Sequence, residues 1–283
     1  MKIVDPAPAE IAGLAERYPE FLRPRLKTRI APAATAAAIL GLFVFGLVYL
    51  DFSPARLLDG LVALARFAAL MVPPSPEGHF LLFAQSLAET LAIALLGTLT
   101  ASILAFPFGL AGARNVVANP IIHFLVRRVL DIIRSVDTLV WALLWIAVVG
   151  LGPFAGVLAI ASSDLGALGK LFAETLETGD ARALEGVRAA GGARVQGVRF
   201  GILPQALPVL AGQALYFFES NTRSATIIGI VGAGGVGLHL YEAIRTLEWR
   251  EVSFIVLMIL VAVAIIDFGS SRLRAAMGAK SAG

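Results

Sequence analysis

The sequence predicts an all-α membrane protein that crosses the bilayer six times. Of its 283 residues, 58% are hydrophobic and only 15% are charged, and its mean hydropathy is +0.83. These values lie far outside the range of ordinary globular domains. Uncharged apolar runs of about 20 residues recur along the chain, which is the length that a helix needs to cross the bilayer core while satisfying its own backbone groups.

The composition also excludes several kinds of chemistry. The chain contains no cysteine, so disulfides, thiolate metal sites and cysteine nucleophiles are excluded. Its three histidines, His79, His123 and His239, are too far apart to form a local metal-binding motif, and we expect packed or interfacial imidazoles instead. We therefore expect no metal or cofactor in this chain.

The first third of the chain predicts one span and one surface helix. Residues 1–29 mix acidic and basic side chains before any apolar run, which differs from a cleaved signal and favours a cytoplasmic, partly interfacial segment. Residues 30–50 are uncharged and form the first predicted span. Ser53-Pro54 then favours a helix start, and apolar residues recur at helical spacing beside three charged residues up to Arg66, which is typical of a helix on the membrane surface.

The number of spans depends on an uncharged stretch from Thr138 to Ser163, which Gly150-Leu-Gly-Pro153 interrupts. Two spans that turn there place the basic residues of 170–203 on the same side as both termini, whereas a single span places them outside, against the positive-inside rule. We therefore predict cytoplasmic termini and a cytoplasmic tail at 272–283. The six predicted spans are about 30–50, 88–112 with a kink at Pro107, 129–149, 154–172, 206–233 and 251–269.

Residues 178–204, here called the polar segment, lie between apolar runs and are the part most suited to a soluble partner. Asp180 can cap a helix formed by residues 181–190, and Gly191 can adopt the left-handed conformation that ends it. A second short helix is predicted up to Pro204, which should block further backbone pairing.

Polar side chains interrupt the fifth span near its middle, where a lone charge costs on the order of 3 kcal/mol or more. Glu219 and Arg223 are four residues apart and can pair on one helical face. One hypothesis is that Arg223, with nearby hydroxyls or Asn221, lines a route and donates hydrogen bonds to an oxyanion. The other is an ion pair that locks this span against the second, third or fourth. The polar residues are Glu219, Ser220, Asn221, Arg223, Ser224 and Thr226.

Two glycine patterns imitate nucleotide-binding motifs. Gly232-Ala-Gly-Gly-Val-Gly237 satisfies the dinucleotide fingerprint, but it follows a membrane span rather than a strand. We predict a helix break or close-packing site there, part of a gate that includes Gly232, Gly234 and Gly235. Gly169-Lys170 resembles the end of a phosphate-binding loop but lacks its other required residues, so this chain is not expected to bind ATP.

The spacing of the polar segment resembles a known signature. Glu185 is followed by Gly191 after six residues and by Leu203-Pro204 after twelve more. This resembles the inner-membrane permeases of ATP-binding-cassette (ABC) importers, and the similarity extends from Arg134 to Arg274. Where the signature has alanines and isoleucine, this chain has Gly186, Val187 and Gly201, all of them small or apolar.

Three further stretches are most similar to the permeases of phosphonate importers. They are Gly150-Leu-Gly-Pro-Phe-Ala-Gly-Val-Leu-Ala159, Phe200-Gly-Ile-Leu-Pro-Gln205, and Glu219-Ser-Asn-Thr-Arg-Ser-Ala-Thr226 running into the glycines up to Gly237. Two residues depart from the pattern: Asp137 stands where such permeases carry proline, and Asp164 lies near the middle of the fourth span.

The resemblance implies an inner-membrane permease subunit that is not itself an enzyme. It implies a homodimer, two ATPase subunits that bind ATP and magnesium, and an external phosphonate- or phosphate-binding protein, with membrane lipid around the spans and no nucleic acid. The polar segment would couple the permease to the ATPase, through Glu185, Gly186, Ala189, Ala190, Gly191, Leu203 and Pro204.

Two alternative functions find less support in the residues. The acids Asp137, Asp164 and Glu219 would suit a secondary transporter driven by protons or sodium, but no inverted repeat is visible. A membrane-embedded enzyme would need a metal-ligand cluster or a catalytic set of serine, histidine and aspartate in one membrane plane, which the sequence does not offer.

Overall fold

The computed structural model describes residues 26–280, so most of the predicted interfacial segment 1–29 lies outside the described residues. Within 26–280 every regular element is a helix, which confirms the all-α prediction. The chain divides into two units, residues 1–67 and residues 68–283.

The first unit contains α3 (Leu26–Tyr49) and most of α4 (Pro54–Leu70). Helix α3 covers residues 30–49 of the first predicted span, and from Ile39 on most of its large apolar side chains are exposed, as in a lipid-facing helix. Helix α4 begins at Pro54 as predicted, and the Ser53 hydroxyl accepts a hydrogen bond from the Arg56 backbone N–H at 3.5 Å. Its place on the membrane surface stays a prediction.

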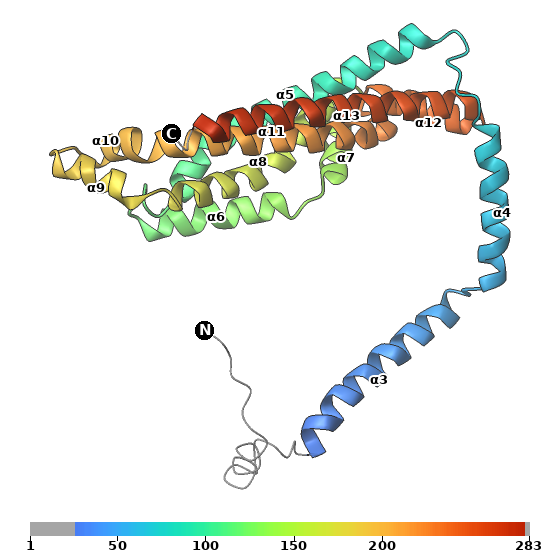
Figure 1. Cartoon of the computed structure of the whole chain (residues 1–283), viewed down its shortest axis with the longest axis horizontal. Coiled ribbons are helices and arrows are strands. Elements are labelled where there is room, and N and C mark those ends of the chain that lie inside the picture. Colours follow the sequence, from blue (N-terminus) through green and yellow to red (C-terminus); the bar gives the residue numbers. More distant parts are fainter. Residues whose placement is uncertain (1–25, 281–283) are drawn as a thin grey trace, which may run out of the picture. The chain divides into compact units, whose positions relative to one another are not determined.

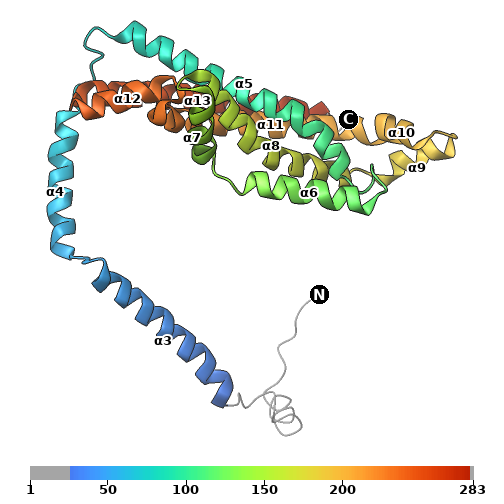
Figure 2. The same cartoon turned by 180° about the vertical axis from the view of Figure 1, so that it is seen from behind.

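The second unit is a bundle whose long helices lie alongside one another (Figures 1 and 2). The short helices of the polar segment project from one end, where α13 also ends, and α12 lies at the other end (Figure 1). Helix α13 continues to Lys280 through most of the predicted tail 272–283, whose cytoplasmic position stays a prediction. The main helices are α5 (Phe80–Gly112), α6 (Pro120–Arg134), α7 (Thr138–Val149), α8 (Pro153–Glu177), α11 (Leu203–Ile228), α12 (Val236–Arg245) and α13 (Trp249–Lys280).

Small residues let α8 approach its neighbours at backbone distance. A Cβ atom added at Gly166 would lie 2.6 Å from the Arg134 backbone nitrogen on α6, and one added at Gly97 on α5 would lie 2.7 Å from the Ile160 Cβ. Such contacts replace the hydrophobic driving force that is absent between helices in lipid. Helix α8 is therefore the central element, with α5 and α6 packed closely against it.

The predicted third span, 129–149, is not one helix. Helix α6 ends at Arg134, α7 begins at Thr138, and the two are bent by 85°. The cause is local: the Asp137 carboxylate accepts a hydrogen bond from the Leu139 N–H at 2.8 Å and caps α7. An N-cap residue lies outside helical geometry, so Asp137 starts a new helix instead of continuing the old one.

The predicted turn between the third and fourth spans is present. Gly150 and Gly152 have φ values of 91° and 133°, which favour glycine, and Pro153 begins α8. Within the described residues, five helices are long and apolar enough to cross a membrane, and the bent pair makes up to six. The helices extend past several predicted limits: α5 starts at Phe80, and a helical run that is kinked at Gly232 covers Arg194–Ala233.

Candidate functional site

The polar segment forms two short helices, of which the first matches its prediction. Helix α9 (Ala181–Ala189) is capped by the Asp180 carboxylate, which accepts a hydrogen bond from the Arg182 N–H at 2.9 Å. Gly191 has φ 81° and ends this helical turn in the left-handed conformation. Both local signals read from the sequence are therefore confirmed.

The prediction that Pro204 ends the second helix is wrong. Helix α10 (Arg194–Gln196) continues through the π-helix η1 (Gly197–Ile202) into α11 without a break. The Leu203 N–H donates to the Val198 carbonyl, five residues back. Pro204 lies in the first turn of α11, where its missing N–H matters little because the π turn has already interrupted the α-helical ladder.

The two arms of the polar segment touch through glycines. A Cβ atom at Gly201 would lie 3.2 Å from the Ala183 carbonyl oxygen, and one at Gly197 would lie 2.5 Å from the Leu184 Cδ1. The glycine at 201, where the signature has isoleucine, therefore lets α9 lie directly on the backbone of η1.

The candidate coupling residues lie mainly on the exposed side of this segment. Glu185, Gly186, Ala189, Ala190 and Gly191 are exposed, and so is Pro204, while Leu203 is partly buried against the core. Among the described residues, no side chain forms an ion pair with Glu185. Its carboxylate is available to a partner.

Glu219 pairs with two arginines in the middle of the bundle. The predicted contact exists, with 3.8 Å between a carboxylate oxygen and the Arg223 Nη1. The shorter contact, 3.2 Å, joins Glu219 to Arg274 on α13. An ion pair that locks the fifth span against the second, third or fourth span was predicted, and this is wrong. The ion pair joins the fifth span to the sixth, because α13 extends into the predicted tail.

Asn221 belongs to a buried polar cluster that the sequence did not indicate. Its Nδ2 donates to the Thr98 Oγ1 at 2.8 Å and to the Asp164 carboxylate. The three side chains are at most 5% exposed and come from α5, α8 and α11. Asp164 is therefore part of an interhelical hydrogen-bond cluster, of the kind that holds membrane helices together.

The remaining polar residues of α11 differ in how exposed their side chains are and in whether they already form hydrogen bonds. The Thr226 hydroxyl donates to the Thr222 carbonyl of its own helix at 3.3 Å. Ser220 is partly buried, and Ser224 lies in a pocket of about 130 Å³ beside Asp137 and Thr138. The Arg223 side chain is 53% exposed. Of the predicted route residues, Arg223 is therefore the one whose donors face away from this chain's core.

The glycine segment after α11 breaks the helix as predicted. Gly232, Gly234 and Gly235 all have positive φ values, of 103°, 84° and 75°. The Glu89 carboxylate on α5 accepts the Gly235 N–H at 3.1 Å, and the Thr90 hydroxyl accepts the next N–H at 2.8 Å. The backbone donors at the start of α12 are thus satisfied by α5.

These glycines line a pocket of about 290 Å³ together with residues of α12. Helix α12 lies at the end of the bundle opposite the polar segment (Figure 1). Glu89 and Ser86 from α5, the Gly152–Pro153 turn and His239 from α12 complete the wall of the pocket. Within residues 26–280 the glycine motif has no strand before it, so the dinucleotide interpretation is excluded by context.

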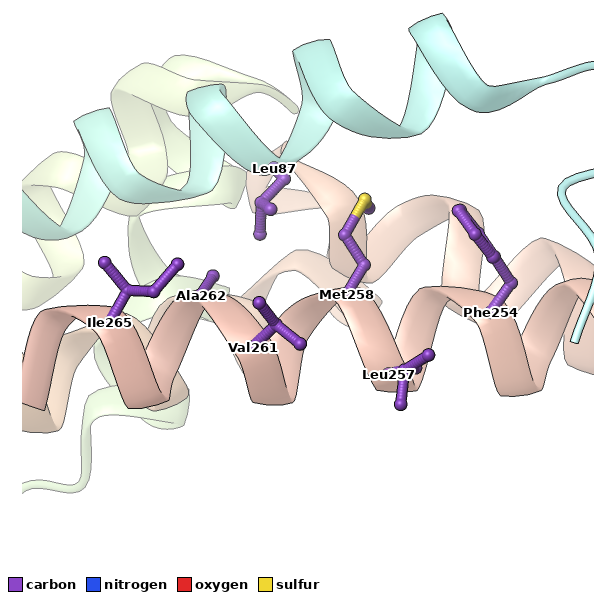
Figure 3. Close-up of a pocket in the computed structure, with 7 residues that line it drawn as sticks. All are labelled: Leu87, Phe254, Leu257, Met258, Val261, Ala262 and Ile265. Atoms are coloured by element: carbon purple, nitrogen blue, oxygen red, sulfur yellow. The ribbon is translucent and has the colours of Figure 1, made fainter.

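A groove of about 270 Å³ between α5 and α13 has a different character. Figure 3 shows Leu87 of α5 pointing toward a row of side chains on α13, and the residues lining the groove are all apolar. Such a wall offers no donor to an anion, which is typical of a surface that meets lipid. The candidate route therefore does not run through this groove.

Comparison with known proteins agrees with this architecture. Residues 105–280 match the family model of the binding-protein-dependent transport system inner membrane component. The phosphite transport system permease protein PtxC of Stutzerimonas stutzeri is 35% identical, over 84% of this chain and 86% of that protein. The phosphate-import permease protein PhnE of Mycolicibacterium smegmatis is 36% identical, over 88% of this chain and 47% of that protein.

A solved structure supports the fold. The inward-facing MetNI methionine ABC transporter aligns with a TM-score of 0.64 and 21% identity, covering 72% of this chain and 99% of that chain. At this identity the match shows the fold alone. Together with the family match and the two relatives, it shows that the chain belongs to the inner-membrane permeases of binding-protein-dependent ABC importers.

Proposed function

We propose that two copies of this chain form the membrane pathway for a phosphorus oxyanion, a phosphonate or the related phosphate or phosphite. A separate ATPase that binds ATP and magnesium drives the transport, and an external binding protein delivers the ligand. The observation that carries the proposal is the exposed polar segment, in which Glu185 is free of partners within the described chain. The names of the relatives support the substrate class.

The arrangement of the bundle supports a cytoplasmic position for the polar segment. It lies at the same end as the end of α13 (Figure 1), and both carry basic residues, as the positive-inside rule expects for the cytoplasmic face. The glycine-lined pocket then faces the outside, where a binding protein would release its ligand. Arg223, between these two ends, offers the donors that an oxyanion requires.

The test is reconstitution in proteoliposomes with the ATPase and binding protein. We expect uptake of labelled phosphite or phosphonate that needs ATP and no ion gradient. Glu185→Lys should abolish most uptake, and ATP hydrolysis should no longer depend on the binding protein. The amount of the variant permease in the membrane should stay normal. Uptake driven by a proton or sodium gradient without ATP would overturn the proposal in favour of a secondary transporter, and full activity of Glu185→Lys would remove the polar segment from the coupling role.

A further inference from the structure

The last residue of α8, Glu177, is bonded to a part of the chain far from it in sequence. One carboxylate oxygen lies 2.8 Å from the Arg127 Nη2 on α6, and the other accepts the Arg114 backbone N–H at 2.8 Å. The side chains of Glu177 and Arg127 are 25% and 19% exposed. This shielding makes a charge-assisted bond stronger than it would be in water.

Neighbouring contacts also link the end of α8, the end of α5 and helix α6. The Arg127 Nε donates to the Gly112 carbonyl at 3.2 Å, and the Asn115 side chain donates to the Leu176 carbonyl at 2.5 Å. These carbonyls belong to the last turns of α5 and α8, which lack helical partners. The buried imidazole of His123 accepts from the Arg114 Nε at 3.4 Å. The α5–α6 turn is thus bonded to the end of α8.

The polar segment begins directly after Glu177. A second set of hydrogen bonds joins the beginning of the segment to its end. The Asp180 N–H donates to the Gln205 side chain at 3.0 Å, and the amide of Gln205 donates to the Gly201 carbonyl at 2.7 Å. The beginning and the end of the segment are therefore bonded to each other. The segment can move as one body, and its root at Glu177 is bonded to α5 and α6 as well as being continuous with α8.

We propose that Glu177 is a positioning residue for coupling. Through Arg127 and the Arg114 backbone it transmits displacement of the polar segment to α5 and α6, in addition to α8 and α11, which the chain joins covalently to the segment. The inference rests on the proposed function, because it assigns a path for the motion that an ATPase imposes.

The test uses Glu177→Gln in the complete transporter. Glutamine keeps the shape and one acceptor but loses the charge that holds Arg127. We expect the amount of ligand transported per ATP hydrolysed to fall about fivefold, which corresponds to a loss of about 1 kcal/mol of coupling free energy, with an unchanged melting temperature of the complex. The matched control is Glu174→Gln, one turn earlier on the exposed side of α8, which should leave the ratio unchanged.

A second measurement is a double-mutant cycle. Because Glu177 acts through Arg127, Arg127→Gln should lower the ratio similarly, and the double variant should be no worse than either single one. A wild-type ratio in both variants, additive losses, or a parallel loss of hydrolysis and transport at constant ratio would each overturn the inference. Failure of the proposed function would look different, because the unmodified complex would then show no ATP-dependent uptake.

Discussion

Asn221, Asp164 and Glu219 make contacts between helices, whereas the Arg223 side chain is exposed. Asn221 and Asp164 bond to each other and to a threonine on α5, so their role is to join helices. Glu219 keeps a contact with Arg274 that does not involve Arg223. Removing the Arg223 guanidinium therefore leaves Glu219 paired with Arg274, so the effect on transport can be separated from the effect on folding.

Substitution of Arg223 tests the route hypothesis. We expect Arg223→Ala to reduce uptake about tenfold or more, because an oxyanion loses a charge-assisted donor. Arg223→Lys should restore uptake only weakly, since an ammonium cannot offer the paired donors of guanidinium. Uptake by reconstituted vesicles is the measurement. Normal uptake by Arg223→Ala, combined with weaker dimerisation in detergent, would assign Arg223 to the subunit interface instead.

Individual residues also show what could be predicted from the sequence. The Asp180 cap and the left-handed Gly191 were readable because their partners lie within a few residues. The partners of Asn221 and Glu219 were not, because Thr98 is 123 positions away and Arg274 is 55 positions away. A single hydroxyl such as that of Thr98 in an apolar run carries no periodic signal, so only the packed bundle shows that Asn221 is its partner.

At the scale of helices, the positions of the helices could be predicted from the sequence better than the bends and continuations between them. The turn at Gly150–Pro153 was predicted from its glycines and proline, and it is present. The bend before α7 was missed because residues 129–149 have the composition of one span, although Asp137 is a recognisable cap. The continuation through Pro204 was missed because a π turn leaves no sequence signal as clear as that of proline.

The break between α11 and α12 gives a prediction at this scale. Gly234 has φ 84°, and a Cβ atom there would lie 2.6 Å from the Glu89 carboxylate. Gly234→Ala should therefore strain the backbone by about 1–3 kcal/mol and reduce uptake. Gly212→Ala is the control, because that position in α11 has open space around it. Equal uptake by both variants would show that the break needs no glycine at 234.

The joint between α5 and α13 gives a pH-dependent prediction. The hydrogen bond that the His79 Nδ1 donates to the Glu251 carboxylate, at 2.8 Å, raises the pKa of His79 above its ordinary value of 6.5. The protonated histidine binds better, so the contact is fully present below about pH 6.5 and is lost as the pH rises through the higher folded-state pKa. The difference in melting temperature between wild type and His79→Gln should thus shrink at alkaline pH. A difference that stays constant with pH would show that the contact is not ionic.

At the scale of the whole molecule, the absence of cysteine makes the orientation directly measurable. Single cysteines in place of Arg188 and Arg245 would lie at opposite ends of the bundle, on α9 and α12. In intact cells an impermeant thiol reagent should label position 245, and position 188 only after the membrane is opened. Labelling in the reverse order would invert the predicted topology and move the polar segment outside.

The helical run from Arg194 to Ala233, which is kinked near its end at Gly232, has a mechanical consequence. It contains 40 residues, so at about 1.5 Å per residue it is roughly 60 Å long, more than the full thickness of a bilayer with its headgroups. In the orientation proposed above, this helical run connects the cytoplasmic face of the membrane with the outer face. Displacement of its cytoplasmic end would then reach the kink at Gly232 through one helical run.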